Sequence, residues 1–292
     1  METRWLYNTS ETLPKLCEAA EKTCVIPMGC VEKHGLHLPL GQDIIQGSHL
    51  TYMASQLETV CVFPDFTFGD TPGKVPYSVP YGSICVPLDT QMLLLEQLCE
   101  QISDNGFKKI LVLNAHGGNN LWLPTFSRKL YYKDYDFVFA TTYVDLPAPH
   151  IMAEILEKEG SGSIPELTQE DEELIIKYHK QDMIIGHGCM GETAYMMGIS
   201  PESVHLDRLG IESGQSTHKA DHLLKAGIRL ASNGWDINYP NAYSADDPIG
   251  CNERIGKAAL RIEAERLAKI FKLFKEDNTL TEFSDSRRWK CR

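Results

Sequence analysis

The chain has a shortage of positive charge relative to its acidic residues, and this disfavours nucleic-acid-binding functions. Of its 292 residues, 28 are Lys or Arg and 40 are Asp or Glu, which gives a formal net charge of −12 at pH 7. Such a surface repels a phosphate backbone. The sequence also contains no basic stripe with interleaved aromatic residues. We therefore predict no nucleic-acid partner.

The sequence also lacks the patterns of secreted, disulfide-linked and membrane proteins. No uninterrupted apolar run is long enough to span a bilayer, and residues 1–10 carry no basic segment followed by an apolar one. The nine cysteines include no C-x-x-C pair, and we interpret them as buried free thiols. The expectation is a cytoplasmic protein in a reducing compartment, without a membrane partner.

Segments typical of strands alternate with segments of helical periodicity along most of the chain. Short apolar strands are expected at 24–27, 60–63, 109–114 and 137–141, and helices at 10–21, 44–57, 91–104, 150–158, 172–180 and 252–275. A further helix is expected to open in the segment 186–193 and to run through residue 197. This alternation predicts an α/β fold with a mostly parallel β-sheet flanked by helices on both faces. We assign residues 1–277 to a single domain and expect residues 278–292 to be a polar tail that frays.

Residues 64–89 are rich in Pro and Gly, which predicts a long connection with little regular structure. Connections of this length in compact domains are usually functional or mobile. Tyr77 and Tyr81 lie in it. They either line a pocket or pack beneath an ordinary surface loop.

Side chains that suit metal ions occur in three glycine-containing segments, each of which follows an expected strand or precedes an expected helix. In a parallel sheet such segments share one edge, so these side chains could converge. Carboxylate oxygens and imidazole nitrogens suit Zn²⁺, Mn²⁺ or Fe²⁺, and no cysteine is needed among them. The candidates are Glu32, His34, Asp43, His116, His187 and Glu192.

Each of these signals also has an ordinary structural interpretation. Residues two apart in an extended chain point to the same side, so Glu32 and His34 could reach one site, yet many surface strands carry such a pair without metal. Gly117 and Gly118 after His116 could form a tight turn, or an anion site at a helix N-terminus. The combination of the three segments is what favours a metal site.

Three motifs resemble those of the creatininase family of metal-dependent amidohydrolases. They are PMGCVEKHG at 27–35, with LPL at 38–40 and Asp43 after it, then NAHGGN at 114–119, and HGCMGET at 187–193. The similarity covers roughly residues 21–275. The resemblance implies the creatininase-like α/β fold. It also implies a homo-oligomer, because members of the family form ring-like hexamers or other homo-oligomers.

The resemblance also implies two divalent metal ions per chain, drawn from Zn²⁺, Mn²⁺ and Fe²⁺. Glu32 and His116 would bind one ion, and His34 would bind the other. Asp43 would bridge the two ions, and Glu192 is the candidate that completes the ligand set of the second ion, the one bound by His34.

The implied reaction is hydrolysis of a non-peptide or cyclic C–N amide bond in a small molecule. A metal-bridged hydroxide would attack the amide carbon, and the resulting oxyanion would be stabilised by a metal and by backbone N–H groups. His187 is our candidate for proton transfer to the leaving nitrogen, and Glu192 as general base is the competing assignment. Asn114 or Asn119 could orient the ligands.

Two departures weaken creatinine as the particular substrate. Creatininase has Tyr-Glu after the histidine of the second motif, and that Glu is a ligand, whereas Gly117 and Gly118 stand here. Creatininase also covers its substrate with tryptophans from the region before the third motif, and this chain has none between Trp122 and Trp235. A creatinine-like amide is the default substrate. The alternatives are deformylation of a formamidopyrimidine-type compound and a non-catalytic, metal-binding member of the family.

Basic side chains near the site would indicate an anionic substrate, whereas tyrosines from the long connection would indicate a planar ring. Lys33 and Lys74 are the candidate basic residues. Lys33 lies between two predicted ligands, so it is either a substrate contact or a solvated side chain that points away.

Overall fold

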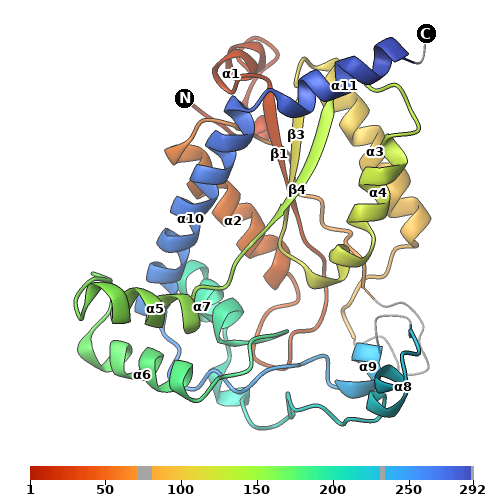
Figure 1. Ribbon diagram of the computed structural model, residues 1–292. Coiled ribbons are helices and arrows are strands. Elements are labelled where there is room, and N and C mark those ends of the chain that lie inside the picture. Colours follow the sequence, from red (N-terminus) through yellow and green to blue (C-terminus); the bar gives the residue numbers. More distant parts are fainter. Residues whose placement is uncertain (72–80, 231–233, 291–292) are drawn as a thin grey trace.

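A computed structural model describes residues 1–71, 81–230 and 234–290, with side chains described as far as residue 285 (Figure 1). Its described strands are all parallel and form one sheet in the order β2-β1-β3-β4. The strands are β1 (Thr23–Met28), β2 (Cys61–Val62), β3 (Lys109–Asn114) and β4 (Val138–Tyr143). The predicted parallel α/β fold is confirmed.

Eleven α-helices and four short 3₁₀ helices accompany the sheet in the described ranges. The α-helices are α1 (Leu13–Ala19), α2 (Gln42–Leu57), α3 (Leu88–Asp104), α4 (Leu123–Leu130), α5 (His150–Glu159), α6 (Gln169–Lys180), α7 (Met190–Ile199), α8 (Asp221–Lys225), α9 (Trp235–Asn238), α10 (Glu253–Glu276) and α11 (Thr279–Lys290). The 3₁₀ helices are η1 (Trp5–Tyr7), η2 (Gly117–Leu121), η3 (Pro201–Ser203) and η4 (Leu206–Arg208).

Alternate side chains of the central strands enter two separate apolar cores, because successive side chains of a strand point to opposite faces. Val25, Leu111 and Leu113 enter the core that also contains residues of α2, α7 and α10. Ile26 and Val112 enter the core that contains residues of α1, α3 and α4. Both faces of the sheet are therefore covered by helices, as Figure 1 shows with α2 and α10 on one side and α3 and α4 on the other.

The C-terminal segment differs from the prediction of a frayed tail. Residues 279–290 form α11, which runs across the end of the sheet in Figure 1. The side chains of Leu280 and Phe283, three residues apart on one helical face, lie with Phe137 and Phe139 around a cavity of about 360 Å³. Asp277 accepts a hydrogen bond from the Leu280 backbone N–H at 3.3 Å and so caps the helix. These two residues provide an apolar surface on one face of the helix.

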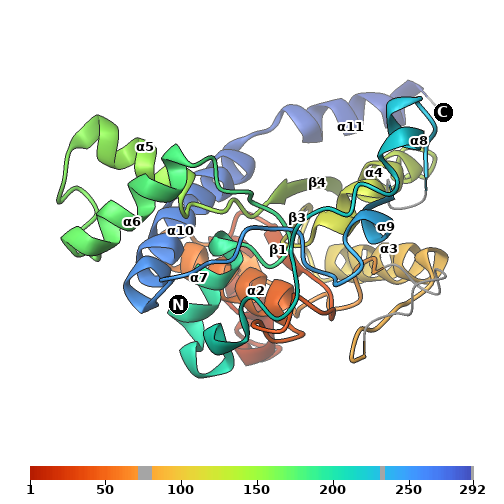
Figure 2. The same ribbon diagram turned by 90° about the horizontal axis from the view of Figure 1, so that it is seen from below.

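The carboxyl ends of β1 and β3 leave the sheet side by side. Met28 is in register with Asn114, and the Ala115 N–H donates to the Met28 carbonyl at 2.8 Å. The chain after β1 also passes close to α2, since a Cβ on Gly29 would lie 2.6 Å from the backbone nitrogen of Ile44. The segment between α7 and α10, which includes α8 and α9, lies at the lower end of the molecule in Figure 1 and faces the viewer in Figure 2.

None of the helices in the described ranges is both long and apolar enough to cross a membrane.

Candidate metal centre

Asp43 lies at the middle of a buried polar cluster at the carboxyl edge of the sheet. It belongs to the first turn of α2, and its side chain is 1% exposed. Oδ1 lies 3.1 Å from Nε2 of His34, and Oδ2 lies 2.8 Å from Nδ1 of His116. The two oxygens of one carboxylate therefore face histidines from two different segments.

Three histidines of the cluster share one arrangement: each places one ring nitrogen on a backbone carbonyl and the other toward a carboxylate. The carbonyl contacts are His34 Nδ1 to Glu32 at 3.2 Å, His116 Nε2 to Asp70 at 2.6 Å and His187 Nε2 to Lys33 at 2.6 Å. A carbonyl oxygen only accepts, so these nitrogens carry the hydrogen. In the neutral rings, the opposite nitrogens then present a lone pair to the carboxylates. Metal-binding histidines are held in the same way in known sites.

Two further carboxylates complete the cluster. Glu32 is 7% exposed, and its Oε1 lies 3.1 Å from His116 Nδ1 and 3.5 Å from His187 Nδ1. This buried oxygen nevertheless has no hydrogen bond within the described residues. On the other side, Glu192 in the first turn of α7 accepts a hydrogen bond from the Gly188 N–H at 2.6 Å.

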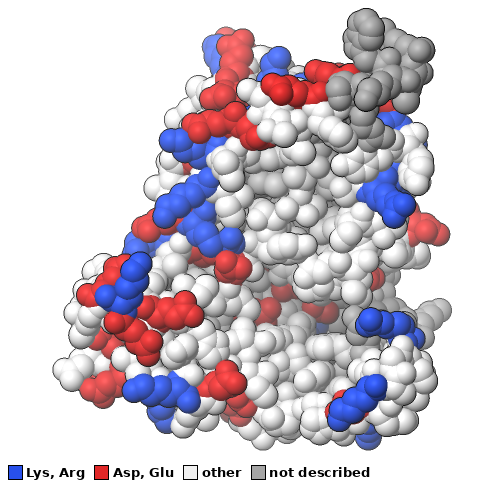
Figure 3. Space-filling model, viewed as in Figure 1, with Lys and Arg blue, Asp and Glu red and all other residues white. Residues whose placement is uncertain are grey.

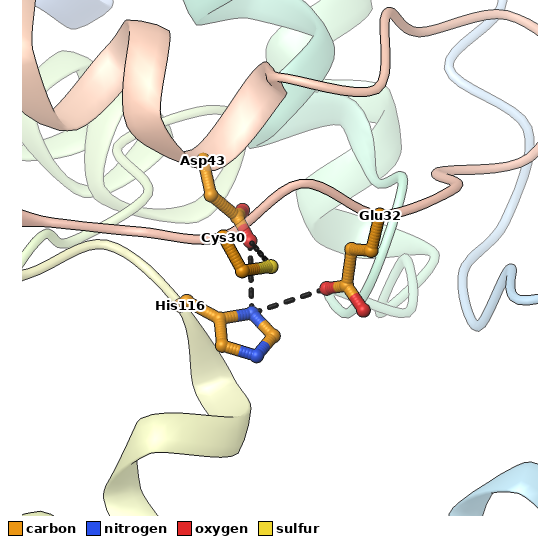
Figure 4. A group of neighbouring side chains, drawn as sticks. All are labelled: Cys30, Glu32, Asp43 and His116. Carbon is orange, nitrogen blue, oxygen red and sulfur yellow. Dashed lines mark hydrogen bonds and ion pairs between the residues drawn. The ribbon is translucent and has the colours of Figure 1, made fainter. Parts of the chain in front are cut away.

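The donor atoms fall into groups whose members all lie within 4.8 Å of one another. One group combines Cys30, Glu32, Asp43 and His116 (Figure 4). A second combines His34, Asp43 and Glu192, and a third combines Glu32, His34 and His187. The first two groups share only Asp43, so this carboxylate belongs to two neighbouring candidate groups of donors.

The buried carboxylates depend on positive charge nearby. Burial raises the pKa of Asp43, but His34 and His116 outweigh it and hold that pKa below its ordinary range. Burial also raises the pKa of Glu32, while His116 and His187 bring it down to about 2. In return, burial lowers the pKa of His34 and Asp43 raises it to about 9. The cluster thus requires positive charge that protonated histidines or divalent cations can supply.

Two groups of the cluster have pKa values displaced mainly by burial. Burial raises the pKa of Glu192 to about 7. Burial, together with the charge of His34, lowers the pKa of His187 to about 4. The His187 ring stacks on His34 with centroids 3.8 Å apart, and it makes a T-shaped contact with Trp235 with centroids 5.2 Å apart. His187 is therefore a buried ring in contact with two aromatic neighbours, and burial favours its neutral form.

The donor set fits divalent metal ions. Three buried carboxylates, from Glu32, Asp43 and Glu192, belong to the cluster, and buried charges require paired charges or metals. Glu32 Oε1 is a buried oxygen without a hydrogen bond. Imidazole nitrogens with carboxylate oxygens suit Zn²⁺, Mn²⁺ and Fe²⁺.

Of the two glycines that follow His116, Gly118 is the one that leaves room for its ring. A Cβ on Gly118 would lie 2.5 Å from His116 Nε2 and 2.4 Å from the Asp70 carbonyl oxygen, while a Cβ on Gly117 would meet nothing within 4 Å. Asn114 also holds this residue: its Oδ1 accepts from the His116 N–H at 3.2 Å, and its Nδ2 donates to the His116 carbonyl at 2.9 Å. A side chain at position 118 is thus incompatible with the observed His116–Asp70 hydrogen bond.

All six residues predicted as ligands or catalytic groups come together in the structure, although their chemical roles stay predictions. They are Glu32, His34, Asp43, His116, His187 and Glu192.

Other candidates from the sequence are placed differently. The Lys33 ammonium forms an ion pair with Glu212 at 2.5 Å, so this lysine is already matched with a carboxylate. Tyr81 has a fully exposed side chain and lines no pocket of the cluster. Lys74 and Tyr77 lie outside the described residues.

Sequence reasoning missed two residues. Cys30 was interpreted only as a buried thiol, yet its Sγ lies 3.1 Å from Asp43 Oδ2. The signal was present, because Cys30, Glu32 and His34 continue the same alternation along an extended segment. Trp235 gave no signal, because its ring reaches His187 from a segment with no motif.

The fold and the cluster define an α/β protein with a candidate two-cation centre at the carboxyl edge of its parallel sheet. The model of one protein family, Creatininase, described as creatinine amidohydrolase, matches residues 8–271. The chain therefore belongs to the creatininase family, which confirms the resemblance seen in its motifs. Membership implies an amidohydrolase, a hydrolase that acts on C–N bonds.

Solved structures share the fold over nearly the whole chain. A candidate creatinine amidohydrolase from Bacteroides fragilis NCTC 9343 is 22% identical, with a TM-score of 0.68 over 96% of this chain and 99% of that one. A manganese form of creatininase is 14% identical, with a TM-score of 0.69 over 95% and 100%. A creatininase variant complexed with creatine is 15% identical, with a TM-score of 0.66 over 95% and 100%. The chain has no significant match among the curated proteins compared with it.

Proposed function

We propose that this protein is a two-metal amidohydrolase that cleaves a non-peptide or cyclic C–N amide bond in a small, creatinine-like molecule. The observation that carries the proposal is the position of Asp43, whose Oδ1 and Oδ2 face His34 and His116 at 3.1 and 2.8 Å. A carboxylate that divides its oxygens between two donor groups suits two ions held side by side. Family membership supports the reaction class.

The ligands are divided between two ions in this proposal. Glu32 and His116 would hold one ion, while His34 and Glu192 would hold the other, with Asp43 between them. Zn²⁺, Mn²⁺ and Fe²⁺ all suit these donors, and one structural neighbour is a manganese form of creatininase. Bound divalent ions in such a site lower the pKa of a water molecule and polarise a carbonyl.

The chain's own residues hold the histidines in position and move protons. The backbone carbonyls of Glu32, Asp70 and Lys33 fix the ring orientations. We assign proton transfer to His187, whose Nδ1 faces the interior of the cluster while Nε2 is bound to Lys33. Glu192 is the competing assignment, and replacement of each residue in turn distinguishes the two.

The substrate class is tested by assay of the purified, Mn²⁺- or Zn²⁺-loaded protein against creatinine and a panel of formamides. Turnover of creatinine or a related cyclic amide supports the proposal, since a structural neighbour of the same fold is a creatininase complexed with creatine. Turnover of formamides alone selects the deformylase alternative. Turnover of none by fully loaded protein contradicts the enzymatic proposal and selects the non-catalytic alternative.

We further propose that the protein is cytoplasmic and assembles as a homo-oligomer, for which the family hexamer is one possibility. The face centred on β4 carries few charged side chains and is bordered by charged ones (Figure 3). β4 is an edge strand, and the large side chains of Tyr132 and Phe283 beside it are 80% and 53% exposed. A second copy of the chain would cover this face.

A further inference from the structure

We propose that Cys30 is a ligand, through its Sγ, of the metal ion that Glu32, Asp43 and His116 would bind. This half of the centre would then contain one sulfur donor and prefer zinc to manganese. The inference rests on the proposed two-metal function. It adds a ligand that the sequence motifs did not indicate.

The first support is the position of the sulfur. Cys30 Sγ lies 3.1 Å from Asp43 Oδ2, and the donor atoms of Cys30, Glu32, Asp43 and His116 all lie within 4.8 Å of one another. Figure 4 shows these four side chains turned toward a common point. Tetrahedral zinc with bonds of 2.0 to 2.3 Å holds its donors about 3.4 Å apart. The four donors therefore need only small movements to surround one ion.

The second support is the local chain geometry. Cys30, Glu32 and His34 are buried, whereas Val31 and Lys33 between them are partly exposed. This alternation is the pattern of an extended segment that turns every second side chain to the same side. The segment that presents the two predicted ligands thus also presents the thiol, which is 0% exposed.

The third support is the charge of the ligands. Glu32 Oε1 is buried, lies 3.1 Å from His116 Nδ1 and has no hydrogen bond within the described residues. The carboxylates of Glu32, Asp43 and Glu192 would carry three negative charges, one fewer than the positive charges of two divalent cations. The Cys30 thiolate would supply the fourth negative charge and a further donor to the ion held by Glu32, Asp43 and His116.

Binding of the metal ion by Cys30 requires the thiol to lose its proton. The S–H bond breaks, the metal–sulfur bond forms, and the proton passes to solvent, so metal binding releases a proton. A thiolate is a soft donor and favours zinc or iron over manganese. The remaining donors are of the kind that manganese accepts, so loss of the sulfur would move the preference toward manganese.

The test is X-ray absorption at the zinc edge of the full-length, zinc-loaded protein. We expect one sulfur for every two zinc ions, at about 2.3 Å, and its absence from Cys30→Ser. The matched control is Cys99→Ala, which removes a buried thiol of the α3 core and should keep the sulfur signal. Competition between zinc and manganese provides a second measurement, in which Cys30→Ser should lower the preference for zinc by at least about tenfold.

The outcomes separate this inference from the function on which it depends. Wild-type protein with two zinc ions and no sulfur neighbour overturns the Cys30 assignment and leaves the two-metal function intact. Wild-type protein that binds no zinc or manganese contradicts the proposed function itself. Because the wild-type spectrum decides the first question, the inference stays testable even if Cys30→Ser does not fold.

Discussion

At the scale of single residues, the cluster is organised by the way each histidine is anchored. Each of His34, His116 and His187 has one ring nitrogen fixed on a backbone carbonyl. That contact determines which nitrogen faces the carboxylates, and a backbone acceptor holds the ring more rigidly than a mobile side chain would. The nitrogen atoms that would bind a cation are therefore already in place before it binds. This preorganisation lowers the free-energy cost of binding the cation.

Replacement of His187 or Glu192 distinguishes proton transfer from metal binding. We expect His187→Asn to keep full metal content and to lower kcat by about 10²- to 10⁴-fold, because it removes only a proton-transfer group. Glu192→Gln should instead lose one of the two ions, since it weakens the donor set that includes His34 and Asp43. Elemental analysis and steady-state kinetics of both variants give the measurement. Loss of metal from His187→Asn, with unchanged metal in Glu192→Gln, would exchange the two roles.

The residues of the site were predictable to the extent that they occur in local patterns. Glu32, His34 and Asp43 are close in sequence, and together with the two later glycine-containing segments their residue types and spacing select them as candidates. Cys30 was not selected because buried thiols are common and the sequence does not show which of them faces a carboxylate. Lys33 could not be placed either, because its partner Glu212 is far away in the sequence.

At the scale of elements, the turn from β3 into η2 places His116 against the chain that follows β2. The Asp70 carbonyl accepts a hydrogen bond from His116 Nε2. Gly118 leaves space for this contact because it has no side chain. Asn119 also reaches across, since its Oδ1 accepts from the Asp70 N–H at 2.9 Å. The chain after β2 and the turn after β3, which are far apart in the sequence, thus both hold His116 in position.

A methyl group at position 118 should weaken metal binding without unfolding the protein. In Gly118→Ala the new Cβ would lie 2.5 Å from His116 Nε2, so the ring must move and its hydrogen bond to Asp70 is lost. Loss of a contact that orients a metal ligand typically lowers metal affinity by about 10- to 100-fold. Gly117→Ala is the matched control, because its Cβ meets nothing within 4 Å. Equal metal affinity in the two variants would contradict this role of Gly118.

The contact between α3 and the region of α4 depends on an ionised carboxylate and is expected to depend on pH. Glu96 of α3 is 3% exposed and binds Lys129 at 2.7 Å, Lys133 at 2.8 Å and the Tyr135 hydroxyl at 2.7 Å. Burial raises its pKa, but these partners outweigh burial and lower it from 4.5 to about 2. A lowered folded-state pKa means that the contact stabilises the protein above the unfolded-state pKa and is lost as the pH falls toward the folded-state value.

Glu96→Gln should therefore destabilise the protein mainly at neutral pH. We expect a loss of about 1–3 kcal/mol in the free energy of unfolding near pH 7, as for a hydrogen bond to a charged group. The difference from wild type should shrink as the pH falls from 4.5 toward 2, the window between the two pKa values. Urea titrations at several pH values give the measurement. A difference that stays constant across this window would show that the charge of Glu96 does not matter.

At the scale of the whole molecule, the sheet and its covering helices were predictable because their periodicities are local. The strands at 109–114 and 138–143 and the long helix α10 follow directly from apolar spacing. The segment between α7 and α10 could not be predicted, because distant contacts hold it in place. The Gly35 N–H, for example, donates to the Ala242 carbonyl at 2.9 Å. The helix α11 was not predicted for the same reason, since its apolar residues lie beside residues of β4 around a shared cavity.

The uncharged face around β4 predicts self-association. Light scattering of the purified protein should give the mass of an oligomer, that is, of two or more chains of 32.9 kDa each. Tyr132→Glu, which places a charge on a side chain that is 80% exposed on this face, should shift the protein toward the monomer. Leu57→Glu, at an exposed position at the end of α2, should not. A monomeric wild type would refute the proposed homo-oligomer.

The central claim is that Asp43 bridges two metal ions, and metal stoichiometry tests it most directly. Elemental analysis of native protein, purified without chelator, should find two divalent transition-metal ions per chain. Asp43→Asn should hold less than one, whereas Glu96→Gln, which alters a buried carboxylate on α3, should hold both. Fewer than one ion per chain in the wild type, with no change on addition of Zn²⁺ or Mn²⁺, would contradict the account, as would full metal content in Asp43→Asn.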